Sequence, residues 1–166
     1  MPHSVPVSKL MYNRNNWPIL RSKADVRHAI KVLRIVTEEQ KLGHGRSTPL
    51  VLDDDGNLLG FIHLTDLLRN VRSLCEKADA PCELDQATTP IKNLVRSFAG
   101  SVTAEDSILK ALDIMMDNGV SLVPVLKNGK LEGIVKLSDI FDTVAALLFD
   151  EQNPEERRRL VGRFHL

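Results

Sequence analysis

The sequence predicts an α/β (α+β) fold in which two tandem repeats, each a small sheet with flanking helices, pack around a pseudo-twofold axis. Three observations lead to this prediction. The stretch LLGFIHLTDL, which begins at residue 58, returns as LEGIVKLSDI at residue 131, 73 positions later. A hairpin pattern with a turn at Asp55-Gly56 or Asn128-Gly129 precedes each copy. A segment with helical spacing of apolar residues precedes each hairpin.

A capping signature marks the start of the first helix in each repeat. Ser22 stands three residues before Asp25, and Thr103 stands three residues before Asp106. In each pair the hydroxyl and the acid can satisfy backbone N–H groups reciprocally, so we expect the helices to begin there. The two signatures are 81 residues apart, while the apolar positions of the two helices fit an offset of 82. The alignment of the first helix of one repeat with that of the other is therefore uncertain by one residue.

The hairpins and the closing helices can be aligned in the same way. Pro49 corresponds to Pro124 at an offset of 75, against 73 for the following glycines, which predicts two extra residues in the first hairpin. After the two similar stretches, amphipathic helices open at Thr65-Asp66 and at Ser138-Asp139. Each repeat is therefore expected to contain an extended entry, a helix, a two-stranded hairpin and a closing helix.

Similar entry segments, PVSKLM at residue 6 and PIKNLV at residue 90, extend the duplication over nearly the whole chain. We expect a first repeat at residues 6–72, a linker at 73–89, a second repeat at 90–150 and a C-terminal helical tail at 151–166. One repeat has too little one-sided apolar surface to be stable alone, so the two repeats should pack sheet to sheet.

Composition and charge exclude several classes of protein. The 22 basic and 22 acidic residues cancel, so no global field draws the chain to nucleic acid or to an anionic membrane. No apolar run approaches the roughly 18 to 20 residues of a membrane span, and the start MPHSVPVSKL lacks the apolar core of a signal peptide. We expect a cytoplasmic protein without membrane contact.

Two smaller features leave alternatives open. Cys75 and Cys82 have the wrong spacing for a zinc site, and we interpret them as free thiols, with a redox-sensitive pair as the alternative. The arginines at 157–159 follow acids in the tail, as the helix dipole favours. They indicate a surface or dimer-contacting helix, with a contact to a partner or to nucleic acid as the alternative.

The sequence does not group side chains for catalysis or metal binding. Asp53 to Asp55 lie in a hairpin turn with no matching fourth ligand. The five histidines have no ligand spacing, and no Ser-His-Asp or Cys-His set can be placed on shared elements. We therefore expect neither an enzyme nor a metal site.

The stretch VSLVPVLKNGKLEGIVKLSDIF, which begins at residue 120 and has a partial copy upstream, resembles the CBS-domain pair, also called a Bateman module. The resemblance implies a regulatory unit that binds an adenosine-bearing ligand, such as AMP, ADP, ATP or S-adenosylmethionine, in two clefts between the repeats. It implies no chemistry and no required cofactor, a homodimer, and signalling to an unidentified effector protein. A ligand-free structural or dimerisation module is the alternative, and a nucleotide-acting enzyme is a weaker one.

An aspartate in the first turn of each closing helix suits a ribose. The carboxylates of Asp66 and Asp139 can accept hydrogen bonds from two vicinal hydroxyls, and the helix N-terminus attracts phosphate. The alternative is that the Thr65-Asp66 and Ser138-Asp139 pairs are only helix caps.

The third residue after each glycine distinguishes the two copies. The family commonly has Thr or Ser there, whereas this chain has His63 and Lys136. Lys136 would place an ammonium beside a phosphate, and His63 would carry positive charge only when protonated. Either could equally be a surface side chain or could block the cleft.

By the resemblance, each cleft combines the closing strand of one repeat with the entry segment and proline strand of the other. The predicted Asp139 cleft contains Lys136, Ser138, Asp139, Arg46, Ser47, Thr48 and Pro49, with residues 17–19 nearby. The predicted Asp66 cleft contains His63, Thr65, Asp66, Val120, Ser121, Pro124, Phe98 and Gly100. Because Lys136 and Arg46 are both cationic, we expect the Asp139 cleft to be the better anion site. In the other cleft, Phe98 could pack on an adenine ring and Gly100 would allow its close approach.

Overall fold

The computed structural model describes residues 5–40, 48–76, 89–148 and 155, with the backbone alone at 37–40 and 74–76. Arg46, Ser47, Cys82 and the arginines at 157–159 lie outside the described residues, as does the side chain of Cys75. The predictions made for these residues therefore stay predictions.

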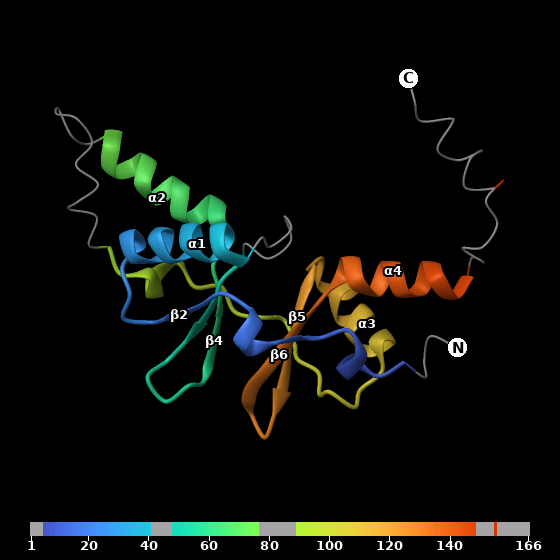
Figure 1. The fold of residues 1–166 in the computed structure, drawn as a ribbon. Coiled ribbons are helices and arrows are strands. Elements are labelled where there is room, and N and C mark those ends of the chain that lie inside the picture. The colour runs from blue at the N-terminus through green and yellow to red at the C-terminus, as the bar shows by residue number, and fades with distance from the viewer. Residues whose placement is uncertain (1–4, 41–47, 77–88, 149–154, 156–166) are drawn as a thin grey trace.

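Both repeats have the predicted order of elements (Figure 1). The first contains β2 (Ile19–Arg21), α1 (Val26–Gln40), β3 (Leu50–Leu52), β4 (Leu58–Phe61) and α2 (Leu64–Glu76). The second contains η5 (Ile91–Leu94), α3 (Ile108–Asn118), β5 (Leu122–Lys127), β6 (Lys130–Lys136) and α4 (Leu137–Leu148). Ahead of β2 lie η2 (Val7–Lys9), β1 (Tyr12–Asn13) and η3 (Arg14–Asn16). The strands form two small sheets, ordered β2-β3-β4 and β1-β6-β5, which confirms the predicted fold class.

The helices α1 and α3 begin later than the capping signatures predict. α1 begins after Asp25, whose carboxylate accepts a hydrogen bond from the His28 backbone N–H at 2.7 Å. α3 begins after Ser107, which is its N-cap. The Thr103 backbone N–H does donate to the Asp106 carboxylate, at 2.7 Å, but these residues form a turn ahead of the helix. α1 and α3 begin 82 residues apart, so the two helices align at an offset of 82, as their apolar positions indicated.

The strand pairing also corrects the alignment of the hairpins. Leu50 lies opposite Phe61 in the first hairpin, and Pro124 lies opposite Ile134 in the second. Because Phe61 and Ile134 are equivalent, Pro124 corresponds to Leu50 and not to Pro49. The first hairpin therefore has one extra residue, where the proline alignment predicts two.

The entry segments are exchanged between the repeats. β1 pairs with β6 of the second repeat, and Arg96 pairs with Phe61 of the first. In the same way, the Val7 N–H donates to the Asp106 carbonyl at 2.8 Å, and the Ile91 N–H donates to the Ala24 carbonyl at 3.0 Å. Equivalent residues of the two entry segments thus make equivalent bonds, which gives the fold its pseudo-twofold symmetry.

Each repeat has its own core, and the exchanged segments complete it. The first core consists of Leu20, Val26, Ala29, Leu33, Val51, Ile62, Leu67 and Ile91. The second consists of Val7, Val102, Ala104, Ile108, Ala111, Met115, Val123, Val125, Val135 and Ile140. A third cluster joins the two sheets and consists of Trp17, Leu50, Leu52, Leu131 and Ile134. Because Ile91 belongs to the first core and Val7 to the second, neither repeat is complete without the other.

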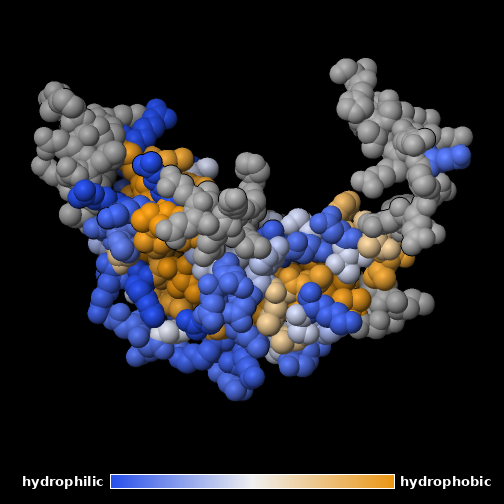
Figure 2. All heavy atoms as spheres, viewed as in Figure 1, coloured by the Kyte–Doolittle hydropathy of each residue, from blue (hydrophilic) through white to orange (hydrophobic). Residues whose placement is uncertain are grey.

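The closing helices carry exposed apolar side chains at equivalent positions. On α2 these are Leu64 and Leu68, and on α4 they are Leu137 and Phe141. Figure 2 shows apolar surface over the α1 and α2 side and along α4. None of the helices in the described ranges is both long and apolar enough to cross a bilayer.

Candidate functional site

A cavity of about 140 Å³ lies between the repeats on the Asp66 side. It is lined by Thr48, Phe61, His63, Phe98, Gly119, Val120, Ser121 and Leu122. Four residues predicted for the Asp66 cleft, His63, Phe98, Val120 and Ser121, are therefore brought together from both repeats. The cavity is smaller than the roughly 300 Å³ of a typical small-molecule pocket, so it has room for a ring and not for a whole nucleotide.

Aromatic side chains form one wall of this cavity. The Phe61 ring centroid lies 4.8 Å from that of Phe98 and 5.1 Å from that of His63, which it meets edge to face. Such arrangements present flat apolar faces against which a planar ring can pack. The cavity therefore offers aromatic side chains against which a planar ring could pack.

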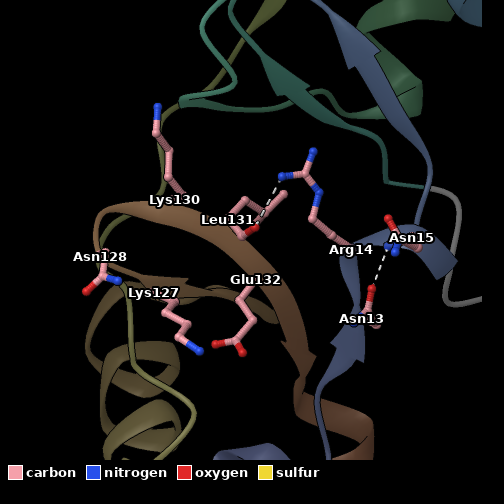
Figure 3. A pocket seen from close by; sticks show the side chains of 8 residues that line it. All are labelled: Asn13, Arg14, Asn15, Lys127, Asn128, Lys130, Leu131 and Glu132. Atoms are coloured by element: carbon pink, nitrogen blue, oxygen red, sulfur yellow. Dashed lines mark hydrogen bonds between the residues drawn. The ribbon is translucent and has the colours of Figure 1, made fainter.

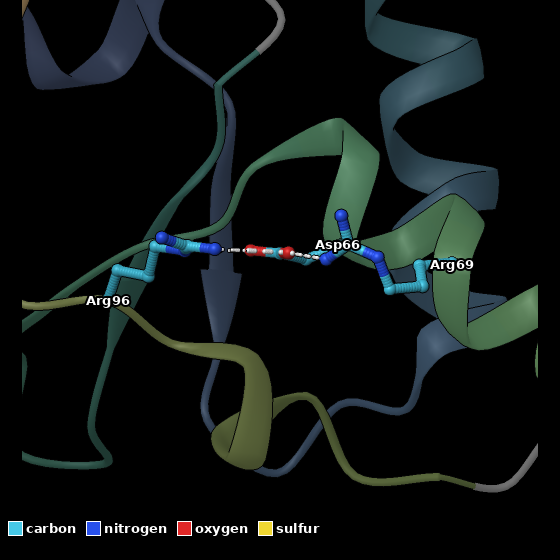
Figure 4. A network of polar contacts seen from close by, with 3 residues as sticks. All are labelled: Asp66, Arg69 and Arg96. Atoms are coloured by element: carbon cyan, nitrogen blue, oxygen red, sulfur yellow. Dashed lines mark hydrogen bonds and ion pairs between the residues drawn. The ribbon is translucent and has the colours of Figure 1, made fainter.

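The carboxylate of Asp66 is fully engaged by two arginines (Figure 4). Arg96 Nε donates to Oδ2 at 2.8 Å and Arg96 NH2 donates to Oδ1 at 3.2 Å. Arg69, one turn further along α2, donates from NH1 to Oδ1 at 2.8 Å. The Arg96 hydrogen bonds outweigh the effect of burial and, with the neighbouring positive charges, hold the pKa of Asp66 below its usual value. Asp66 is 8% exposed and stays ionised as part of an ion pair that joins the two repeats.

The other residues predicted for the Asp66 cleft do not line the cavity. Thr65 is exposed on α2. Pro124 is buried in β5, where its carbonyl accepts a hydrogen bond from the Val102 N–H. Gly100 faces α3, since a side chain there would meet Ile114.

Asp139 has the equivalent position in α4 but different neighbours. The Tyr12 hydroxyl donates to Oδ1 over a long 3.4 Å, and Lys136 Nζ lies 3.9 Å from Oδ2. Oδ2 is buried and accepts no hydrogen bond from any residue that the structure describes. A buried carboxylate oxygen normally has a hydrogen-bond donor, so this atom can accept a hydrogen bond from a further group.

Tyr12 also belongs to this site, although the sequence patterns did not predict it. Lys136 Nζ lies 4.9 Å from the centre of the Tyr12 ring, and the Trp17 ring lies 5.6 Å from it. Trp17 is buried and its Nε1 donates to the Thr48 carbonyl at 2.9 Å. The signal was available in the alignment of the entry segments, which places Tyr12 84 residues before Arg96.

Thr48, Ser138 and Pro49 were also predicted for the Asp139 cleft. The prediction for Thr48 was wrong, because Thr48 lines the cavity on the Asp66 side. Ser138 is exposed on α4. Pro49 is buried, and its carbonyl accepts a hydrogen bond from the Ile62 N–H at 3.1 Å. Lys136, Asp139 and Tyr12 are thus the residues that the structure brings together here.

A second hollow, of about 400 Å³, lies between the turn of the second hairpin and residues 13–15 (Figure 3). It is lined by Asn13, Arg14, Asn15, Lys127, Asn128, Lys130, Leu131 and Glu132. Lys130 already donates to Asn57 Oδ1 at 2.6 Å, and Arg14 to the Leu131 carbonyl at 3.4 Å. Lys127 and Lys130 leave the hairpin in opposite directions. The cations do not converge, so this groove does not form an anion site.

No group of three or more His, Cys, Asp or Glu side chains in the described ranges is arranged to hold a metal ion.

The family model of the CBS domain matches residues 7–73 and 88–146, one range in each repeat. The chain belongs to the CBS-domain family.

One curated relative is an uncharacterized 17.7 kDa protein in the bps2 3′ region of Acidianus ambivalens, 30% identical over 98 residues. The match covers 58% of this chain and 53% of that protein, so the chain spans about half the length of the curated relative it matches.

Several solved structures share the fold of this chain. An uncharacterized conserved protein from Pyrococcus horikoshii has a TM-score of 0.61 at 19% identity, over 87% of this chain and 95% of its own. CBSX2 in complex with AMP has a TM-score of 0.62 at 18% identity, over 87% and 99%. The cytosolic domain of the Mg²⁺ channel MgtE in complex with ATP has a TM-score of 0.64 at 20% identity, over 84% and 49%.

Proposed function

We propose that this CBS-domain chain is a regulatory module that binds an adenine nucleotide in the Asp139 cleft and passes that state to a partner protein. The observation that carries the proposal is the buried Oδ2 of Asp139, which has no hydrogen-bond donor among the described residues and lies beside the Lys136 ammonium. The AMP and ATP in two structures of the same fold support the choice of ligand class.

The chemistry of the site suits the sugar and the phosphate of a nucleotide. The vicinal hydroxyls of a ribose can donate to the Asp139 carboxylate, taking the place of the long Tyr12 bond. Lys136 can then turn from Asp139 to a phosphate, close to the N-terminus of α4, whose dipole also favours an anion. An uncharged nucleoside would use only the first of these contacts.

The proposed mechanism of regulation is linkage between the ligand and the arrangement of the repeats. Residues from both repeats meet at the site, since Tyr12 belongs to the first and Asp139 to the second. A ligand that touches both stabilises one relative arrangement, and it shifts the affinity for a partner by its differential binding to the two states. Homodimerisation through the apolar faces of α2 and α4 belongs to the same proposal.

Thermal unfolding in the presence of ligands tests the proposal. AMP, ADP, ATP, S-adenosylmethionine and adenosine are each added at millimolar concentration, and the melting temperature is recorded. A ligand at 100 times its Kd stabilises the native state by about 2.7 kcal/mol, so at least one phosphorylated ligand should raise the melting temperature clearly. The absence of a shift with every ligand would contradict the proposal.

A ligand-free structural module is the second candidate, and the Asp66 ion pair favours it. Arg96 and Asp66 join the two repeats directly, which is a structural role. A chain that binds none of the five ligands and still unfolds in one cooperative step would support this candidate. Turnover of ATP, measured in the same samples, would instead support a nucleotide-acting enzyme.

A further inference from the structure

Tyr12 and Arg96 have the same position in the two halves of the molecule. The backbone of Tyr12 pairs with Ile134 of the second repeat, and the backbone of Arg96 pairs with Phe61 of the first repeat. Each side chain reaches the first-turn aspartate of the closing helix that follows the strand it pairs with. Besides His63 and Lys136, the two sites therefore also differ at this equivalent position, where one has a phenol and the other a guanidinium.

The Arg96 guanidinium already binds the two carboxylate oxygens of Asp66 to which the hydroxyls of a ribose would donate. Arg96 donates to both carboxylate oxygens of Asp66, and Arg69 adds a second bond to Oδ1. Hydrogen bonds between charged partners are about twice as strong as those between neutral groups, so two ribose hydroxyls cannot displace Arg96 readily. Tyr12 gives Asp139 a single neutral bond of 3.4 Å and leaves Oδ2 without a donor in the described part of the chain.

We propose that the residue at this position determines which cleft accepts a ribose. Arg96 closes the Asp66 cleft to ribose-bearing ligands, and Tyr12 leaves the Asp139 cleft open, so that each chain binds one nucleotide. The inference rests on the function proposed for the Asp139 cleft.

Apart from the engaged carboxylate, the Asp66 cleft retains features that a ligand could use. Phe61 and His63, at the end of β4 and just before α2, line the aromatic cavity together with Phe98, two residues after Arg96; Asp66 itself is not among the lining residues. The backbone of Arg96 exchanges two hydrogen bonds with Phe61, at 2.8 and 2.9 Å, and these do not depend on the side chain. Replacing Arg96 by the residue found at the equivalent position should therefore free Asp66 Oδ2 and create a second site.

Isothermal titration with AMP tests this in the full chain. Wild type should bind one AMP, Arg96→Tyr should bind two, and Tyr12→Arg should bind none. Arg69→Ala is the matched control, because it removes the other guanidinium from the same carboxylate, and it should still bind one. Arg96→Gln serves as a second test in case Arg96→Tyr does not fold, which circular dichroism reports.

The outcomes separate this inference from the proposed function. Two sites in the wild type, or no additional site in folded Arg96→Tyr and Arg96→Gln, would overturn the inference. A wild type that binds no AMP would overturn the proposed function, while a site gained in Arg96→Tyr would still support the role of Arg96.

Discussion

Asp66 and Asp139 show how the neighbours of a residue decide its role. Both lie in the first turn of a closing helix, 73 residues apart. Asp66 meets two permanent cations and becomes half of a structural ion pair. Asp139 meets a tyrosine and a lysine whose ammonium lies beyond hydrogen-bond distance. The same residue type thus forms an ion pair between the repeats on one side, while on the other side it keeps an oxygen without a donor among the described residues, where we propose that a ligand binds.

The Asp66 ion pair predicts a pH-dependent stability. Because Arg96 lowers the pKa of Asp66 in the folded state, the pair's contribution is complete above the unfolded pKa of about 4 and is lost as the pH falls through the folded value. The difference in melting temperature between wild type and Asp66→Asn should be largest at pH 7 and shrink toward pH 3.

The same substitution in an Arg96→Gln background is the control for this prediction. Without the guanidinium, the difference should be small at every pH. A difference that stays constant from pH 7 to pH 3 in the wild-type background would show that the ion pair is not its source.

Lys136 is predicted to give the Asp139 cleft its preference for a charged ligand. In Lys136→Thr the affinity for AMP should fall by about tenfold or more, since a hydrogen bond to a charged group contributes roughly 1.5–3 kcal/mol. The affinity for adenosine should change much less, and titration with both ligands measures the difference. Lys127→Thr, on the exposed hairpin, is the control, and an equal loss for AMP and adenosine in Lys136→Thr would exclude the phosphate contact.

At the level of elements, periodicity and turn chemistry predicted the helices, the hairpins and their order correctly. The boundaries were less predictable, because Thr103 and Asp106 form the bonds of a capping box within a turn and Ser107 caps the helix instead. The proline alignment failed because Pro49 and Pro124 have different places in their strands, which only the cross-strand pairing shows.

The candidate site could be predicted in part. Four residues of the Asp66 cavity, His63, Phe98, Val120 and Ser121, follow from the family resemblance. The ion pair of Asp66 depends on Arg96, 30 residues away in the chain. Nothing in local patterning relates Tyr12 to Asp139, which is 127 residues further on. Both contacts arise from the exchange of entry segments, which the family resemblance implies and the spacing of residues alone does not show.

The glycines opposite the entry segments are predicted to be essential for this exchange. A Cβ at Gly133 would collide with the Tyr12 carbonyl oxygen, and one at Gly60 would collide with the Arg96 carbonyl oxygen. Gly133→Ala should therefore lower the free energy of unfolding by about 1–3 kcal/mol, as overpacking usually does. Urea denaturation measures this value.

Gly100→Ala provides the comparison for the Gly133 variant. Its Cβ would meet only the side chain of Ile114, at 3.3 Å, which can move aside. A smaller loss is expected there. Equal losses in the two variants would contradict the idea that the entry segment is held by close backbone approach.

At the level of the whole molecule, the exchange predicts that the repeats fold only together. A chain divided within the linker, into residues 1–80 and 81–166, leaves each core without the apolar residue that the other half supplies, Val7 or Ile91. Each fragment alone should lack a cooperative unfolding transition, and mixing them should restore one. Trp17, the single tryptophan of the chain, lies between the sheets and reports reassembly by fluorescence. Cooperative unfolding of either fragment by itself would contradict the prediction.

The central claim, that Asp139 is the nucleotide-binding aspartate, is tested most directly by titrating AMP into a matched pair of variants, Asp139→Asn and Asp66→Asn. Both replace a carboxylate by an amide of the same shape at equivalent positions. We predict that Asp139→Asn loses AMP affinity by about tenfold or more, as expected when a charged acceptor is removed, while Asp66→Asn keeps it within a few-fold. Unchanged affinity in folded Asp139→Asn, or a loss confined to Asp66→Asn, would contradict the claim.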